Sequence, residues 1–145
     1  MKKLALLTLV IICTFPLTSF NTYKEESVKN KGIVFFKGTF EEALEKAKAE
    51  NKFIFIDFYA KWCGQCKKLK KSFKDDEVGT YYNKNFINIL VDGETKEGRE
   101  LMLYYQIQSY PTLLIVDYNG RIQTKTTGYL KPYILINFGR RIVPY

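Results

Sequence analysis

The clearest pattern in the sequence is an apolar run from Phe53 to Tyr59 that is interrupted only by Asp57. A run with so little alternation between apolar and polar residues is typical of a strand that is covered on both faces of a sheet. After a short turn, Cys66, Leu69 and Phe73 recur at helical spacing, and lysines occupy most of the positions between them. We therefore predict a buried strand that leads through a tight turn into an amphipathic helix.

Similar patterns predict the other elements. In chain order we expect a strand at 33–36, a helix at 40–50, the buried strand and the amphipathic helix, a short helix ending near 83, a strand at 86–91, a helix at 97–106, strands at 112–117 and 121–127, and a final helix from 132. Thr39 and Glu42 form a capping box, and Asn119-Gly120 is typical of a hairpin turn. The order βαβαβαββα, with the short helix counted with the one before it, predicts an α/β fold with a central mixed sheet flanked by helices on both faces. The first two strands would form a right-handed parallel crossover.

Residues 1–20 have the pattern of a secretory signal peptide. Lys2 and Lys3 precede an apolar core, Leu4–Ile12, that is too short to span a membrane. We expect cleavage near Thr18–Asn21, with an uncleaved anchor as the alternative. The protein is therefore expected to be exported to the periplasm or the cell envelope.

Cys13 closes this apolar core. A bacterial lipoprotein signal has a small residue directly before its cysteine, and Ile12 is bulky. We therefore favour a cysteine that is removed with the signal over a lipid-attachment site. The rest of the chain is predicted to comprise a flexible, polar linker at 21–31 and one domain at 32–145, because 46% hydrophobic residues suffice for one core at this length.

Charge and cysteine content narrow the possible functions. The net charge of +8 falls to +6 when Lys2 and Lys3 leave with the signal. The lysine-rich helix could attract acidic partners or nucleic acid, but a solvated helix face is the favoured interpretation, and the sequence has no nucleic-acid motif. Once Cys13 is removed with the signal, the two remaining cysteines supply only half of a tetrahedral zinc site. The chain has no histidine to complete such a site or to act as the base of a Cys-His protease. We expect no metal and no nucleic-acid partner.

The chemistry is expected at the Cys63-Gly64-Gln65-Cys66 turn. The first N–H groups of a helix lack intrahelical partners and favour a thiolate over a thiol at this position. Because the first sulfur of such a turn is the more exposed, Cys63 is the expected attacking thiol and Cys66 the resolving one. No cofactor is expected beyond this redox-active pair.

The segment from Asp57 to Lys67, DFYAKWCGQCK, resembles the active-site segment of thioredoxin-like proteins, and Ser109-Tyr110-Pro111-Thr112 resembles their loop before the next strand. The resemblance covers about residues 32–145 and implies the thioredoxin fold. The segment Glu45–Lys68 is most similar to exported bacterial members, including the soluble reductase domain of transmembrane thiol-disulfide interchange proteins.

The resemblance also implies a substrate-binding site. Its residues would be Trp62, Gly64, Gln65, Tyr110 and Pro111. The Tyr110–Pro111 bond would be cis, with the loop beside the cysteines, although a proline at this position could also simply mark the start of a strand. Gln65 stands where thioredoxins have proline. The residues between the cysteines affect the reduction potential, so the fold alone does not give the direction of electron flow.

Asp57 is the third candidate catalytic residue. A carboxylate within a buried strand is costly unless it has a partner or a role, and burial would let it accept a proton from Cys66. The resemblance implies the same role. The alternative is an acid at the strand end that reaches solvent. Many thioredoxins have a lysine near this acid on the neighbouring strand, where this chain has Asn88.

Together these features predict an exported thiol-disulfide oxidoreductase that exchanges the Cys63–Cys66 pair with protein thiols and disulfides. We expect a monomeric reductase that draws electrons from a membrane donor, because the compartment is oxidising. Two alternatives stay open: a disulfide oxidase or isomerase, and a non-enzymatic binding module in which Cys63–Cys66 is a structural disulfide.

Overall fold

The computed structural model describes residues 32–144, and the predicted signal, linker and Cys13 lie outside them. The elements in chain order are α1 (Phe40–Glu50), β1 (Phe53–Tyr59), α2 (Gly64–Ser72), α3 (Asp76–Asn85), β2 (Phe86–Asp92), α4 (Lys96–Tyr104), β3 (Thr112–Val116), β4 (Ile122–Thr127) and α5 (Pro132–Arg140). None of the helices in this part of the chain combines the length and the apolar composition that a membrane span needs.

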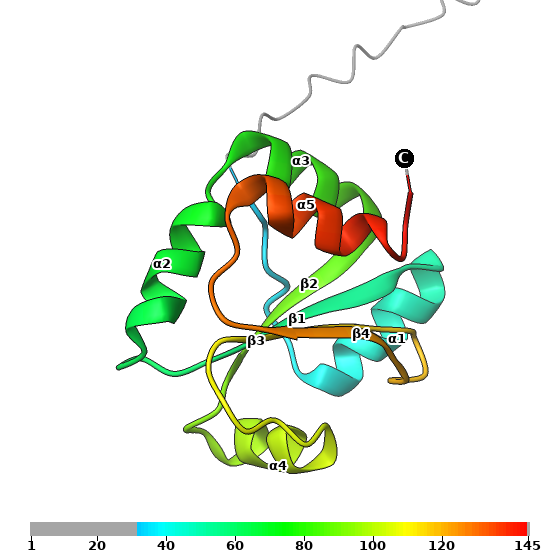
Figure 1. The fold of residues 1–145 in the computed structure, drawn as a ribbon. Coiled ribbons are helices and arrows are strands. Elements are labelled where there is room, and N and C mark those ends of the chain that lie inside the picture. Colours follow the sequence, from blue (N-terminus) through cyan, green and yellow to red (C-terminus); the bar gives the residue numbers. More distant parts are fainter. Residues whose placement is uncertain (1–31, 145) are drawn as a thin grey trace, which may run out of the picture.

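The strands form one mixed sheet in the order β2-β1-β3-β4 (Figure 1). β1 is parallel to β2 and antiparallel to β3, and β4 is antiparallel to β3. α2 and α3 together make the connection from β1 to the parallel strand β2. The predicted hairpin joins β3 to β4, where Gly120 has a φ of +77° and its N–H donates to Asp117 O (2.9 Å). The buried strand therefore becomes an inner strand of the sheet.

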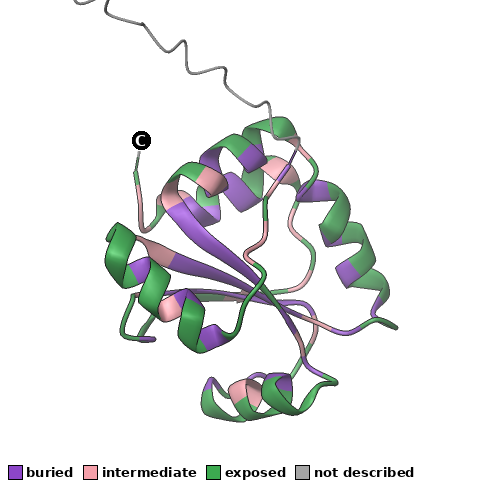
Figure 2. Cartoon of the chain, turned by 180° about the vertical axis from the view of Figure 1, so that it is seen from behind, coloured by how far each residue is buried: buried purple, intermediate pink, exposed green. Residues whose placement is uncertain are grey.

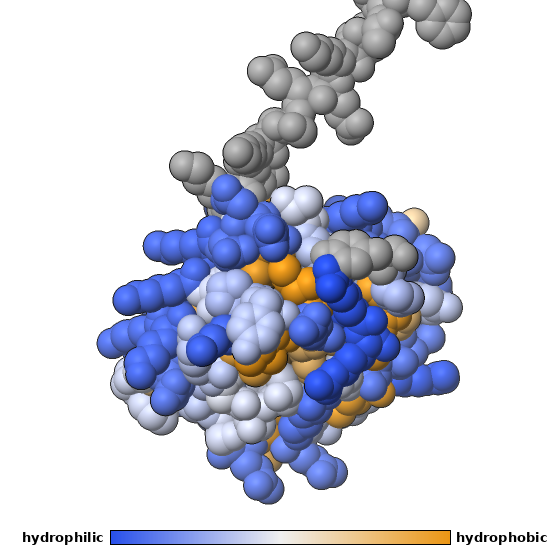
Figure 3. Space-filling view, turned by 45° about the horizontal axis from the view of Figure 1, so that its top comes forward, coloured by the Kyte–Doolittle hydropathy of each residue, from blue (hydrophilic) through white to orange (hydrophobic). Residues whose placement is uncertain are grey.

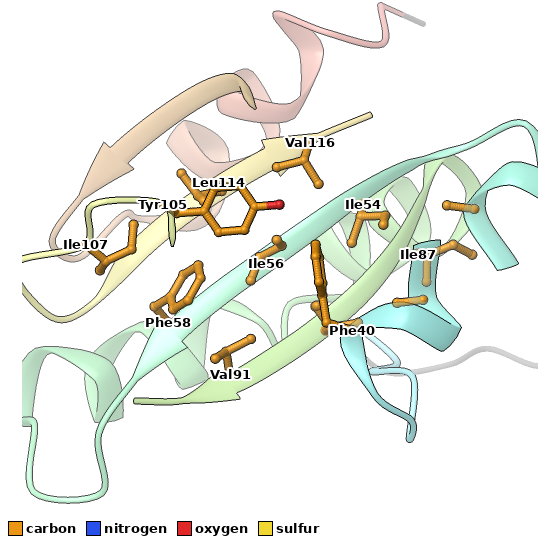
Figure 4. Close-up of a cluster of buried hydrophobic side chains, with 13 residues drawn as sticks. Phe40, Ile54, Ile56, Phe58, Ile87, Val91, Tyr105, Ile107, Leu114 and Val116 are labelled. Carbon is orange, nitrogen blue, oxygen red and sulfur yellow. The ribbon is translucent and has the colours of Figure 1, made fainter. Parts of the chain in front are cut away.

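Helices cover both faces of this sheet, as predicted (Figures 1 and 2). On one face, α1 and the segment after α4 pack against alternate residues of the strands. Phe40 of α1 and Tyr105 after α4 belong to the same buried cluster as Ile56 of β1 (Figure 4). On the other face, α2, α3 and α5 pack against the strand residues whose side chains point the opposite way, such as Phe55 of β1. Because side chains alternate along a strand, Asp57 shares the second face with Phe55 and lies under these helices.

The predicted capping box is present. Thr39 Oγ1 accepts from Glu42 N (3.2 Å), and Glu42 Oε2 accepts from Thr39 N (2.8 Å). Pro132 is the first residue of α5, and Asp75 caps α3 through the N–H groups of Glu77 and Val78. Local sequence therefore determines where these helices begin.

The predicted strand at 33–36 is wrong. These residues run beside β2, but only Phe36 N makes a backbone hydrogen bond to that strand, to Asn88 O (2.8 Å). Asparagine side chains replace the rest of the ladder, because Val34 N donates to Asn83 Oδ1 (2.8 Å) and Asn88 Nδ2 donates to Val34 O (3.2 Å). The predicted crossover between this segment and β1 is therefore also absent.

Replacing Asn83 with alanine should loosen this segment. The variant loses the acceptor for Val34 N and the donor to Gly32 O, so we expect the free energy of unfolding to fall by about 1 to 2 kcal/mol. Denaturant unfolding should show this loss, and Lys84→Ala, an exposed position on the same helix, should leave stability within about 0.5 kcal/mol. An equal loss in both variants would contradict this role of Asn83, because alanine favours the helix and its propensity cannot account for a loss.

Candidate active site

The Cys63-Gly64-Gln65-Cys66 turn begins α2, as predicted. Cys63 and Cys66 are joined by a disulfide, with 5.3 Å between their Cα atoms. Cys63 is the N-cap of the helix, and its Sγ accepts from Cys66 N (3.1 Å). The backbone therefore offers a hydrogen-bond donor and the positive end of a helix to this sulfur, both of which favour a thiolate after reduction.

The two cysteines differ in exposure in the expected order. Cys63 is 5% exposed and Cys66 is 1% exposed, so both are largely covered and the small opening belongs to Cys63. They pack with Ala60, Tyr59 and Tyr110. An incoming thiolate or disulfide would meet Cys63 first, which fits the order of attack inferred from the sequence.

An aromatic surface adjoins this opening. Trp62 is 69% exposed, and its ring centroid lies 5.8 Å from that of Tyr110 in an edge-on arrangement. The Tyr110–Pro111 peptide bond is cis, as predicted, and Pro111 is buried directly before β3. The Tyr110 hydroxyl contacts Met102 Sδ (2.9 Å). The fold thus brings the loop before β3 against the turn before α2, although these two segments lie far apart in the sequence.

Gly64 and Gln65 are exposed in the first turn of α2. A Cβ at Gly64 would meet no other atom within 4 Å, so packing within the chain does not require glycine there. Both residues therefore present their surface to solvent beside Cys63. Their expected contact with substrate stays a prediction.

Asp57 lies at the centre of β1 and is 0% exposed, so the alternative of an acid reaching solvent is wrong. Its place on the strand is between Phe55, which packs in the core that includes Leu69 of α2, and Tyr59, which packs with the cysteines. Neither carboxylate oxygen has a hydrogen-bond partner among the described residues. Burial raises the pKa of Asp57 from its ordinary 3.8 to about 7, and the charge of Lys70 partly opposes the rise. A carboxyl with such a pKa can exchange a proton near neutral pH.

Asn88 does not pair with Asp57. Its amide nitrogen donates to Val34 O (3.2 Å) and Asn83 Oδ1 (3.3 Å), so it belongs to the segment that replaces the first strand. The cation near Asp57 comes from α2 instead, where Lys70 Nζ lies 4.4 Å from the centroid of the Tyr59 ring. Sequence reasoning missed Lys70. The signal was its position four residues after Cys66, one helical turn along the same side of α2.

The other lysines near the turn are exposed. Lys61 Nζ lies 3.7 Å from Asp92 Oδ2, lysines 67, 68 and 71 project from α2, and Lys74 follows the helix. Figure 3 shows hydrophilic side chains along this side of the molecule. Within residues 32–144, no group of three or more Cys, Asp or Glu residues is placed to hold a metal ion.

Comparisons with known proteins agree with this geometry. Residues 40–141 match the family described as thioredoxin-like domain. The thiol:disulfide interchange protein DsbD of Colwellia psychrerythraea is 32% identical over 96 residues, which is 63% of this chain and 16% of that protein. A protein disulfide-isomerase of Datisca glomerata is 29% identical over 83% of this chain and 24% of its own length. The chain thus spans a quarter or less of these relatives.

Solved structures of thiol-disulfide proteins resemble this chain over nearly their whole length. The solution structure of a proposed disulphide-isomerase from Bacteroides thetaiotaomicron has a TM-score of 0.68 and 37% identity, and covers 79% of this chain and 97% of that one. The oxidised C-terminal domain of DsbD from Neisseria meningitidis has a TM-score of 0.62 and 25% identity, and covers 74% of this chain and 98% of that domain. The chain therefore belongs to the thioredoxin-like family of thiol-disulfide oxidoreductases, whose paired cysteines it carries as Cys63 and Cys66.

Proposed function

We propose that the protein is an exported thiol-disulfide oxidoreductase that acts mainly as a reductase of protein disulfides. The observation that carries this proposal is the Cys63–Cys66 pair at the N-terminus of α2, the helix that packs on the face of β1 where Asp57 is buried without a hydrogen-bond partner among the described residues. A structural disulfide needs neither a helix terminus that favours a thiolate nor a carboxyl that can accept a proton. Both features suit a disulfide that opens and closes.

The proposed reaction has two steps. The Cys63 thiolate attacks a substrate disulfide, so that a Cys63–substrate bond forms and the first substrate sulfur leaves as a thiolate. Cys66 then loses its proton to Asp57 and attacks Cys63 Sγ, which releases the second substrate sulfur. The substrate gains two electrons, and the enzyme ends as the Cys63–Cys66 disulfide. The exposed Trp62 and Tyr110, with Gly64, Gln65 and Pro111, would hold the substrate beside Cys63.

Export and the source of electrons belong to the same proposal. The predicted signal at 1–20 supports export of the domain at 32–145, through the linker at 21–31 and with loss of Cys13. The similarity to DsbD, a thiol:disulfide interchange protein, supports a partner in the envelope that returns electrons to the pair. We propose a monomer without metal or nucleic acid, whose substrates are protein thiols and disulfides.

A disulfide oxidase or isomerase is the second candidate. It is favoured by Gln65 at the position between the cysteines where thioredoxins have proline, and by relatives that are named protein disulfide-isomerases. The residues between the cysteines affect the stability of the thiolate and therefore the reduction potential. The direction of the reaction thus depends on a measurable quantity.

The test is the equilibrium reduction potential of Cys63–Cys66 in thiol-disulfide buffers. For a reductase we expect a value near that of thioredoxin, about −270 mV. A value between about −180 and −120 mV would place the oxidase or isomerase first. A pair that never equilibrates with the buffers would overturn both and leave the non-enzymatic binding module.

A further inference from the structure

Among the described lysines of α2, Lys70 is the one whose side chain contacts an aromatic ring of the strand below, Tyr59 of β1. Its Nζ lies 4.4 Å from the centroid of the Tyr59 ring. A cation over an aromatic ring at this distance is held by the electron-rich face of the ring. The contact therefore fixes a positive charge at the end of β1, one helical turn beyond Cys66.

This position brings the charge near Asp57. Tyr59 lies two residues after Asp57, so both side chains project from the same face of β1. Tyr59 also packs with Cys63 and Cys66, which begin the helix that carries Lys70. The carboxyl and the ring thus lie on the face of β1 that α2 covers, and the ring packs with the two cysteines at the start of that helix.

Among residues 32–144, the other neighbours of Asp57 offer it no charge. Across the sheet it pairs with Leu90 of β2 and Leu113 of β3. Asn88 donates to Val34 O instead. The negative charge of Asp92, farther along β2, helps to raise the pKa of the Tyr59 hydroxyl. Burial raises the pKa of Asp57, and the positive charge of Lys70 opposes that rise. The electrostatic balance at Asp57 therefore depends on α2 and not on the neighbouring strand.

We propose that Lys70 is a positioning residue for resolution of the mixed disulfide: held over Tyr59, its charge favours the ionised form of Asp57 that accepts the proton of Cys66. The inference rests on the proposed function. In this step the proton passes from Cys66 Sγ to the Asp57 carboxylate, the Cys63–Cys66 bond forms and the Cys63–substrate bond breaks. The electron pair of the broken bond leaves with the substrate sulfur.

The test uses the reduced protein mixed with an excess of a chromogenic aromatic disulfide, in a Cys13→Ser background so that only Cys63 and Cys66 react. The first thiol released reports attack by Cys63, and the second reports resolution by Cys66. Three variants are compared with the parent. Lys70→Met keeps the apolar stem and removes the charge, Lys70→Arg keeps the charge over the ring, and Lys68→Met removes a charge from the same helix away from Tyr59.

In Lys70→Met, the midpoint of the pH profile of the second release should move upward by about 0.5 to 1 pH unit, because an unassisted Asp57 holds its proton longer. At about pH 6 this corresponds to a three- to tenfold slower second release, and at about pH 9, where Cys66 ionises unaided, to no change. Lys70→Arg should restore the parent midpoint, and Lys68→Met should keep it.

Coinciding profiles for Lys70→Met and Lys68→Met would overturn the role of Lys70, as would a loss of rate in Lys70→Met that is equal at every pH. Direct titration of the Asp57 carboxyl by NMR gives a second measurement, in which the midpoint must also rise in Lys70→Met. Failure of the proposed function would look different. In that case the parent protein itself would show no second release, or the second release would persist in Cys66→Ser.

Discussion

Replacing Cys66 with serine should turn the protein from a catalyst into a trap for its substrates. Cys63 keeps its place at the N-cap of α2, so attack on a substrate disulfide survives. Serine cannot displace the product, so the covalent complex between Cys63 and the substrate accumulates. Turnover of a disulfide-containing protein should fall to the uncatalysed rate, while non-reducing gels show complexes that a thiol reductant releases.

Cys63→Ser is the matched control. It also abolishes turnover, but it should trap far less, because Cys66 is 1% exposed and is poorly accessible to a folded partner. Both variants should carry Cys13→Ser, so that no third thiol contributes. Equal trapping by the two single variants would contradict the assignment of Cys63 as the attacking thiol. A Cys66→Ser variant that traps no thiol partner would contradict the catalytic role of the pair.

The core elements of the fold could be predicted from sequence because their signals are local. Apolar periodicity located β1 and α2, and the capping box located the start of α1. The segment at 33–36 has the same apolar character as a strand, but its hydrogen bonds depend on Asn83 and Asn88, about fifty residues away. An apolar run indicates burial, and only the partner shows whether a ladder forms.

In the candidate site, too, the sequence did not show contacts between distant residues. Cys63, Cys66 and Asp57 lie within ten residues and could be interpreted together, and family resemblance supplied Tyr110 and Pro111 from a distant loop. Lys70 was counted among the solvated lysines of the helix, although its position four residues after Cys66 places it beside the buried stripe. Its contact with Tyr59 depends on how α2 lies across the end of β1, which is a property of the folded chain.

Replacing Asp57 with asparagine should remove a large pH dependence of stability. Because the pKa of Asp57 rises from 3.8 unfolded to about 7 folded, the folded state holds this proton more tightly. The oxidised parent should therefore lose stability as pH rises from about 4 to 7, by up to about 4 kcal/mol, with no further loss above that range. Asp57→Asn should lack this contribution.

The measurement is the difference in the free energy of unfolding between parent and variant at pH 4 and pH 8. The cost of burying the asparagine amide is the same at both pH values and cancels in the comparison. The free energy of unfolding of the variant, relative to that of the parent, should therefore rise by about 3 to 4 kcal/mol from pH 4 to pH 8. Glu100→Gln, an exposed carboxyl on α4, should show no such movement. Parallel curves for parent and Asp57→Asn would mean that burial does not hold the proton.

The same variant should be the poorer catalyst, and the two effects share one cause. Asp57→Asn cannot accept the proton of Cys66, so turnover should slow most at low pH and recover at high pH, where Cys66 ionises unaided. A uniform loss of turnover at every pH would instead indicate altered packing around the cysteines. A variant that is more stable at pH 8 and yet slower at pH 6 would show that the buried carboxyl is kept for chemistry at the expense of stability, since Leu90 and Leu113 on either side offer it only apolar contacts.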